Sequence, residues 1–133
     1  MLRAGPLDLS STFLRLRADA SAEPLNVDET FWQRLTSGQL GDFHHERLVA
    51  GGNFEADWPM WEMHPNGDEM VCLLSGSVTF LLEETQGTRE VVLSKSGTYV
   101  LVPKGIWHTA RTHGPCRMLF ITPGEGTLHR PAR

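Results

Sequence analysis

After residue 45 the chain is cut by glycine and proline into short runs that are rich in β-branched and apolar residues. The thirteen glycines and eight prolines are scattered along the chain instead of being gathered in a linker. Short strands with turn residues at nearly regular spacing are typical of an all-β sandwich or barrel. The sequence therefore predicts an all-β fold, built from the runs RLVAGGNFEA, DWPMWEMH, EMVCLLSGSVTFLLEE, REVVLS, GTYVLVP, GIWHTARTH and CRMLFITP. Within it, EETQGT (83–88) predicts a hairpin loop and SGS (75–77) a tight corner.

Residues 1–25 carry no strong signal. The one helical candidate of the chain is DETFWQRLT, residues 28–36, where Asp28 could cap a short helix. The apolar side chains expected on one side of that helix are Phe31, Trp32 and Leu35. We expect residues 1–45 to form an N-terminal arm, without a core of its own, that packs on a small barrel formed by residues 46–133.

Composition limits the function classes. A chain of 133 residues is one domain with a modest core. A net charge of −4 without a basic stripe argues against nucleic acid and anionic membrane surfaces as partners. No apolar run approaches about 20 residues and the start lacks a secretory segment, so we expect a cytoplasmic protein. Cys72 and Cys116 lie in strand-like runs and are expected to be buried free thiols, not metal ligands.

Several polar side chains surround one turn, in the stretch WEMHPNGDE. Side chains alternate faces along a strand, so Glu62 and His64 point the same way, together with Trp58 and Met60. A hairpin after them would bring Glu69 back towards His64. Two carboxylates and an imidazole are costly to bury unless they are paired or bind a metal. From this stretch alone, a hydrogen-bonded Glu–His cluster and a metal site are both open.

A further histidine follows a second turn, in GTYVLVPKGIWH. Ile106, His108 and Ala110 share one face of the strand that follows. A single histidine after a turn is more often solvated or structurally bonded than a ligand. His108 therefore becomes a candidate metal ligand only when both stretches are considered together.

Together the two stretches resemble the two conserved motifs of the cupin superfamily. The first motif consists of a glycine, five residues, HxH, three or four residues, a glutamate, six residues and a glycine. Its second histidine, its glutamate and its last glycine are matched by His64, Glu69 and Gly76. The second motif consists of a glycine, five residues, PxG, two residues, a histidine, three residues and an asparagine. It is matched without a gap by Gly97, Pro103, Gly105 and His108.

The resemblance covers roughly residues 46–122, and the intermotif stretch of twenty residues, 77–96, is similar to that of small single-domain bacterial cupins. Three positions depart from the motifs. Ala56 stands near the first glycine and Thr112 replaces the asparagine, neither of which weakens the assignment much. The third, Glu62, stands where a metal-binding histidine is expected, and it could supply an oxygen ligand or bond to a neighbour instead.

The resemblance implies a small jelly-roll β-barrel with a divalent metal inside it. The implied ligands are Glu62, His64, Glu69 and His108. Two imidazoles and two carboxylates suit Fe, Mn, Zn or Ni better than Cu(I), because the set has no thiolate or thioether. Trp58, Met60 and Ile106 are candidates to line an apolar pocket beside the metal, with membership of the core as the alternative.

Three functions stay open on the sequence. The favoured one is a metal-dependent enzyme acting on a small organic molecule, with dioxygenase- or isomerase-like chemistry. The others are a non-catalytic small-molecule binding or sensing protein and a metal-free structural barrel. A homodimer is expected, because LLSGSVTFLL and residues 1–40 offer more apolar surface than one small barrel is expected to bury.

The remaining candidate residues are expected to have structural or surface positions and no part in the site. His44 and His45 are expected on opposite faces as surface or interface residues, and His113 in a loop. Tyr99 is expected to pack against its neighbours. The C-terminal segment with His129 predicts a strand that returns to the barrel or to a partner subunit.

Overall fold

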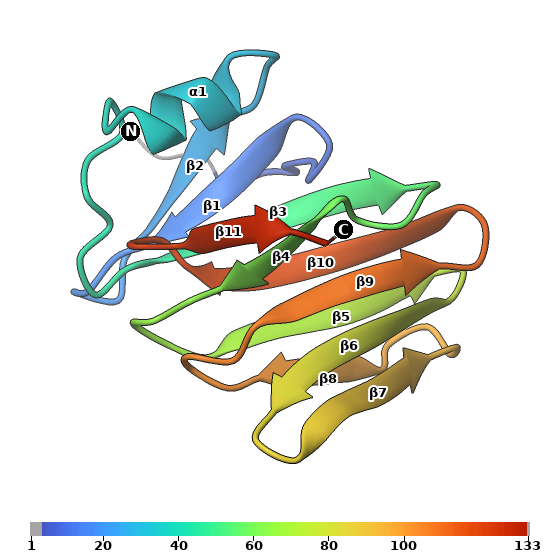
Figure 1. Cartoon of the computed structure of the whole chain (residues 1–133). Helices are drawn as coiled ribbons and strands as arrows, with labels where there is room; N and C mark the ends of the chain where they lie inside the picture. The colour runs from blue at the N-terminus through green and yellow to red at the C-terminus, as the bar shows by residue number, and fades with distance from the viewer. Residues whose placement is uncertain (1–3, 133) are drawn as a thin grey trace.

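The computed structural model describes residues 4–132. In that range the chain forms two antiparallel sheets and one short helix (Figure 1). The six-stranded sheet has the order β2-β1-β3-β10-β5-β8, and the five-stranded sheet has the order β11-β4-β9-β6-β7. The elements are β1 (Thr12–Leu16), β2 (Ala22–Asn26), α1 (Phe31–Thr36), β3 (Arg47–Phe54), β4 (Met60–Met63), β5 (Glu69–Ser75), β6 (Val78–Glu84), β7 (Gly87–Leu93), β8 (Tyr99–Val102), β9 (His108–Thr112), β10 (Cys116–Pro123) and β11 (Leu128–Pro131). The predicted all-β jelly-roll is confirmed.

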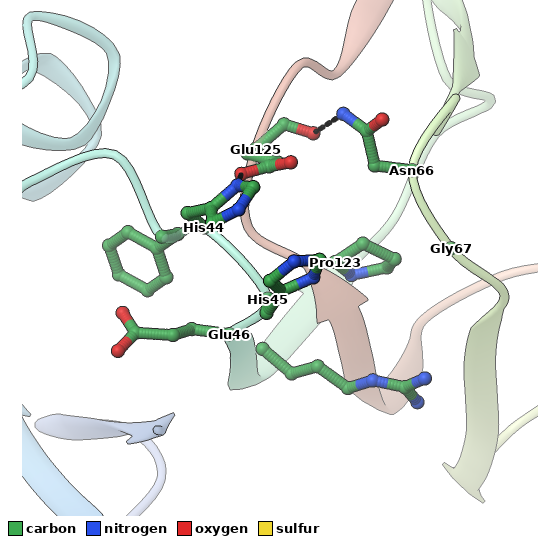
Figure 2. A pocket seen from close by; sticks show the side chains of 9 residues that line it. His44, His45, Glu46, Asn66, Gly67, Pro123 and Glu125 are labelled. Carbon is green, nitrogen blue, oxygen red and sulfur yellow. Dashed lines mark hydrogen bonds and ion pairs between the residues drawn. The ribbon is translucent and has the colours of Figure 1, made fainter. Parts of the chain in front are cut away.

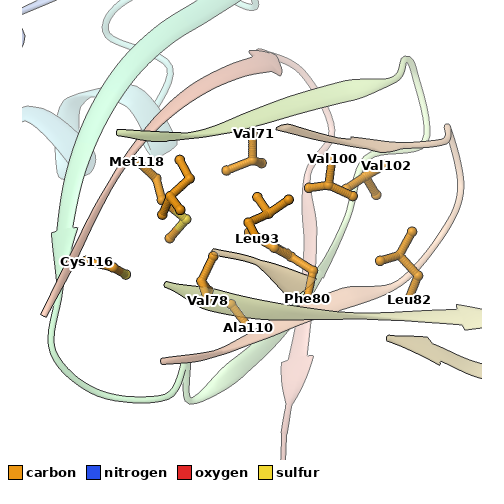
Figure 3. Close-up of a cluster of buried hydrophobic side chains, with 11 residues drawn as sticks. Val71, Val78, Phe80, Leu82, Leu93, Val100, Val102, Ala110, Cys116 and Met118 are labelled. Carbon is orange, nitrogen blue, oxygen red and sulfur yellow. The ribbon is translucent and has the colours of Figure 1, made fainter. Parts of the chain in front are cut away.

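The main core lies between the two sheets (Figure 3). In β5 the inward residues Glu69, Val71 and Leu73 are buried, whereas Met70 and Cys72 on the outer side are half-buried. This alternation is what a strand with one face on a core requires. Each large apolar side chain removed from water there contributes roughly 1.5–3 kcal/mol. The buried cluster consists of Val71, Leu73, Val78, Phe80, Leu82, Leu93, Val100, Val102, Ala110, Cys116 and Met118.

Two predicted turns are confirmed. The hairpin between β6 and β7 closes between Glu84 and Gly87. The corner between β5 and β6 contains Gly76, whose φ of 81° lies in the left-handed region that favours glycine. A Cβ atom at this position would lie 2.4 Å from the Pro115 carbonyl oxygen. The last glycine of the first motif is therefore required by backbone geometry and by close packing against the start of β10.

The N-terminal part contributes more than an arm laid on a barrel. β1 pairs with β3 and β2 pairs with β1, so both extend the six-stranded sheet. A second buried cluster joins this part of the chain to β3 of the barrel. Its buried members are Phe13, Phe31, Phe43, Leu48 and Ala50.

The short helix was predicted in the right place, but with the wrong details. Phe31 is fully buried, whereas Trp32 is 54% exposed, because a helix of six residues buries only a narrow side. Asp28 is not the N-cap. Its carboxylate accepts hydrogen bonds from the backbone N–H and the hydroxyl of Thr30, and Thr30 itself precedes the helix.

Two other expectations need correction. Tyr99 is 54% exposed on the outer side of β8, so it does not pack into the core. Both cysteines are free, as predicted, yet only Cys116 is buried and Cys72 is half-buried. Among the residues described, no helix has the length and apolarity needed to cross a membrane.

Candidate metal centre

Three strands bring the predicted ligands together between the sheets. Glu62 in β4 lies directly opposite His108, the first residue of β9. His64 follows the end of β4, and after a short turn Glu69 begins β5 in the other sheet. The turn thus carries the chain from one sheet to the other, with one side chain at each end reaching the space between them.

The four side chains are close and mostly buried. His64 and Glu69 are 3% and 2% exposed and His108 is fully buried. The Oε1 atom of Glu69 lies 3.0 Å from His108 Nε2 and 3.4 Å from His64 Nε2. Glu62 Oε1 lies 3.8 Å from His108 Nε2, and the Glu62 side chain is 28% exposed. Glu62, His64 and His108 each offer a ligand atom within 4.8 Å of the others.

The atoms that face one another here lack hydrogen-bond partners. Within residues 4–132, the buried polar atoms without a partner include His64 Nε2, His108 Nε2 and Glu69 Oε1. The two imidazoles approach the carboxylate, but their geometry is not that of hydrogen bonds. Buried polar groups are almost always paired, and an unpaired one costs about 1–3 kcal/mol. Three such atoms converging on one point are the donor set that a divalent metal requires, so these residues fit a metal ion.

Neighbouring groups orient both rings. The carbonyl oxygen of Ile106 lies 3.4 Å from His108 Nδ1, and a carbonyl can only accept. The proton of the neutral ring is therefore on Nδ1, which leaves the Nε2 lone pair pointing into the site. His64 Nδ1 lies 2.9 Å from the Thr127 hydroxyl, a contact that holds the orientation of this ring, although a hydroxyl can donate as well as accept. Such contacts to the far nitrogen are characteristic of metal-binding histidines.

The carboxylates are held in a similar way. The Thr122 hydroxyl donates a hydrogen bond of 2.6 Å to Glu69 Oε2, which leaves Oε1 towards the histidines. His129 Nε2 lies 3.0 Å from Glu62 Oε2, so that Glu62 Oε1 faces His108. In both glutamates one oxygen is held by a neighbour and the other is directed into the site.

The electrostatics of the metal-free cluster follow from these contacts. Burial alone would raise the pKa of the Glu69 carboxyl, but the imidazoles of His108 and His64 outweigh burial and lower this pKa from 4.5 to about 2. Burial alone would lower the pKa of His108, but the Glu69 carboxylate, with Glu62 further away, raises it. Without a metal, His108 therefore favours a second proton on Nε2, the atom that a metal would use. Metal and proton compete for the same lone pair.

Three of the orienting residues were not assigned to the site on sequence grounds. Thr122, Thr127 and His129 all come from the end of β10 and the segment after it. β11 pairs with β4, which places His129 opposite Glu62 and confirms that the last segment returns to the barrel. These residues lie at the end of the region that resembles the cupin motifs or beyond it, so no spacing rule pointed to them.

The three residues considered as pocket lining differ in their surroundings. Trp58 and Ile106 pack against the main core, and the Trp58 ring centroid lies 6.3 Å from that of His108. Met60 is half-buried in β4 opposite Pro131, and its carbonyl oxygen accepts a hydrogen bond from Thr109. Trp58 and Ile106 are therefore the stronger candidates for contact with a bound molecule.

A second group of histidines lies on the surface (Figure 2). His44 and His45 border a cavity of about 330 Å³, and their ring centroids are only 3.9 Å apart. The expectation that they lie on opposite faces was therefore wrong, although both are exposed as predicted. His44 Nδ1 lies 3.0 Å from Glu125 Oε2. His113 lies in a bend after β9, as predicted, with Nε2 2.8 Å from the Thr79 hydroxyl.

Comparison with known proteins agrees with this architecture. The family model described as "Cupin domain" matches residues 45–122, which is more than half of the chain and includes all four candidate ligands. The chain belongs to the cupin family. Among curated proteins, no significant match to this cupin is found.

Solved structures show the same fold. A cupin-2 domain containing protein from Shewanella frigidimarina NCIMB 400 aligns with a TM-score of 0.50 at 19% identity, over 58% of this chain and 70% of that chain. Hydroquinone 1,2-dioxygenase from Sphingomonas sp. TTNP3, with 4-hydroxybenzoate bound, aligns with a TM-score of 0.53 at 18% identity, over 62% of each chain. Hydroxypropylphosphonic acid epoxidase from S. wedmorenis aligns with a TM-score of 0.49 at 16% identity, over 57% of this chain and 42% of that chain. This cupin therefore spans less than half of the epoxidase chain. At identities of 18–19%, the likeness to the first two structures concerns the fold alone.

Proposed function

We propose that this cupin binds a divalent metal ion through His64, His108, Glu69 and Glu62 and acts on a small organic molecule beside it. The observation that carries the proposal is the convergence of His64 Nε2, His108 Nε2 and Glu69 Oε1, all buried and without hydrogen-bond partners in the described chain. Mixed imidazole and carboxylate ligands suit Fe(II), Mn(II), Zn(II) or Ni(II). A metal that keeps open positions supplies Lewis acid or O₂ chemistry, as dioxygenase- or isomerase-like reactions need.

The protein residues have separable roles in this proposal. His64 and His108 are the principal ligands, because each is buried and each has its Nδ1 held by a neighbour. Glu69 adds a buried negative charge that offsets part of the charge of the cation. Glu62 is the most exposed of the four, at 28%. Released from the metal, Glu62 could carry a proton for the reaction.

Metal content of the purified protein tests the proposal. We expect one divalent ion per chain after titration with Fe(II), Mn(II), Zn(II) or Ni(II) and removal of the excess. The His64→Ala, His108→Ala double variant should lose it, whereas His45→Ala, a matched change at an exposed histidine, should keep it. Full stoichiometry in the double variant would show that the metal binds elsewhere.

Glu62 needs its own variant, because it replaces a histidine of the motif. Glu62→Gln keeps the shape of the side chain and removes its charge. If Glu62 is a ligand, the variant should bind metal more weakly, and Glu62→His should restore binding with a preference for Ni(II) and Cu(II). If Glu62 only orients another ligand, Glu62→Gln should lower metal affinity by only about 10–100-fold, and Glu62→His should not restore it.

We also propose that two copies associate through the outer face of the six-stranded sheet. The register places two apolar rows side by side on that face. The rows are Ile121–Met70–Leu101 and Leu119–Cys72–Tyr99. Leu101 and Tyr99 are 60% and 54% exposed, and no charged residue interrupts either row. A second copy could cover this face without bringing like charges together.

A further inference from the structure

One buried polar atom remains unexplained by the metal site. In the described chain, the buried side-chain atoms without a hydrogen-bond partner are His64 Nε2, Glu69 Oε1, His108 Nε2 and Trp58 Nε1. The first three can all bind a cation. The fourth is an indole N–H, which is only a donor and cannot bind a metal. Trp58 therefore requires a partner of a different kind.

The Trp58 ring lies next to the candidate metal centre. Its ring lies among Phe54, Phe80 and Phe120, with centroid distances of 5.5, 5.7 and 6.0 Å. The same ring lies 6.3 Å from the His108 ring at an interplanar angle of 63°. The backbone is fixed as well, because the N–H of Trp58 donates to the Ala110 carbonyl oxygen at 3.0 Å. Trp58 is thus a rigid residue on the apolar side of the candidate metal centre.

The chemistry of the two neighbours defines what could bind between them. A divalent cation attracts an anionic oxygen, and an indole N–H needs an oxygen acceptor. The side chains around Trp58 are aromatic and offer only apolar surface to the rest of a molecule. A small acid with an apolar body would satisfy all three requirements at once.

We propose that Trp58 is a substrate-binding residue whose indole N–H donates a hydrogen bond to an anionic oxygen of a small carboxylate or phenolate. This inference rests on the proposed function, because the metal supplies the charge that holds the same molecule. The aromatic cluster of Phe54, Phe80 and Phe120 accommodates its apolar body. Trp58 adds selectivity for molecules that carry an acceptor oxygen at this point.

Nuclear magnetic resonance of the indole N–H groups tests the inference without an activity assay. The chain has four tryptophans, and the Trp58→Phe variant assigns the Trp58 signal by its loss. Zn(II) is added to ¹⁵N-labelled protein first, followed by benzoate as the probe and benzamide as its uncharged counterpart. We expect benzoate to shift the Trp58 indole proton downfield and to slow its exchange with water. The other three indole signals should change little, and benzamide should bind more weakly than benzoate.

Variants add an independent readout. Trp58→Phe keeps an aromatic ring in the cluster and removes the donor together with part of the indole, so Zn(II) affinity should be unchanged while benzoate affinity falls by about 10-fold or more. Trp32→Phe is the matched control at an exposed tryptophan and should change neither affinity.

The outcomes separate this inference from the proposed function. If Zn(II) does not bind, the proposed function fails and this inference fails with it. If Zn(II) binds, the inference alone is overturned by any of three results: benzoate does not bind, benzoate binds without moving the Trp58 signal, or benzamide binds as well as benzoate. Unchanged benzoate affinity in Trp58→Phe would overturn it as well.

Discussion

Replacing Glu69 by glutamine in the metal-free protein should change both its stability and the pH dependence of that stability. The carboxylate is 2% exposed and faces two imidazoles, which lower its pKa from 4.5 to about 2 against the opposing effect of burial. A lowered pKa contributes stability that is fully present above pH 4.5 and is lost as the pH falls through about 2. The lowering of this pKa from 4.5 to about 2 corresponds to about 3 kcal/mol of unfolding free energy.

The pKa of His108 is raised instead of lowered, and it sets the upper limit of the pH range in which the metal-free protein is most stable. Because this pKa is raised above 6.5, its contribution is present below pH 6.5 and is lost as the pH rises through the folded value. The ionised Glu69 and the protonated His108 therefore stabilise the metal-free protein most between about pH 4.5 and 6.5. Glu69→Gln removes the carboxylate from this pair and should abolish most of the stability that the pair contributes between these pH values.

Urea unfolding of chelator-treated protein, followed by circular dichroism, measures this effect. At about pH 6 the variant should be less stable than the parent by an amount on the order of 3 kcal/mol, and the difference should shrink as the pH falls towards about 3. Glu84→Gln, which removes an exposed carboxylate paired with Arg89, should cost less than about 1 kcal/mol at any pH. An equal stability of parent and Glu69→Gln at about pH 6, or a difference that does not change with pH, would refute the reasoning.

Three further predictions concern metal binding, the cysteines and the dimer. Thr122→Val removes the hydrogen bond to Glu69 Oε2 and should weaken metal binding about 10–100-fold with little change in fold, as measured by competition with a chelator; unchanged affinity would contradict the orienting role. Burial raises the pKa of the Cys116 thiol, so iodoacetamide should modify Cys72 much faster than Cys116 in the folded protein, as peptide mass spectrometry would show, and metal content should not depend on either thiol. Leu101→Lys should shift the dimer to monomer in light scattering, whereas Val92→Lys, an equally exposed apolar site on the other sheet, should not; a parent that is monomeric at micromolar concentration would remove the dimer proposal.

Much of the barrel could be predicted because its signals are local. Strand alternation indicates which of Glu69, Met70 and Val71 point inwards, and the backbone requirement at Gly76 marks the corner that follows. The positions of Glu62 and His64 relative to the strand and its turn follow from the same two-residue period. These features depend on a few neighbouring residues, so the sequence contains them directly.

The parts that were missed depend on contacts between distant segments. β1 and β2 are half-exposed and carry arginine, glutamate and a proline, so their alternation is weak. Only the pairing of β1 with β3 and of β2 with β1 identifies them as strands. Thr122, Thr127 and His129 reach the site because β10 and β11 close against other strands. His44 and His45 meet through an unusual backbone, since both Phe43 and His45 have a positive φ, of 54° and 57°. No periodicity in the sequence reports such geometry.

The most direct test of the account is the position of a bound metal in a crystal, located by anomalous scattering at the absorption edge of the metal. We expect a single peak between the two sheets, about 2.0–2.2 Å from His64 Nε2, from His108 Nε2 and from a glutamate oxygen. Glu69 Oε1 should be among the ligands, because Thr122 directs that oxygen towards the histidines. A peak at the surface pair His44 and His45 with none between the sheets would contradict the central claim, and so would a crystal grown with excess metal that shows no peak near His64 and His108.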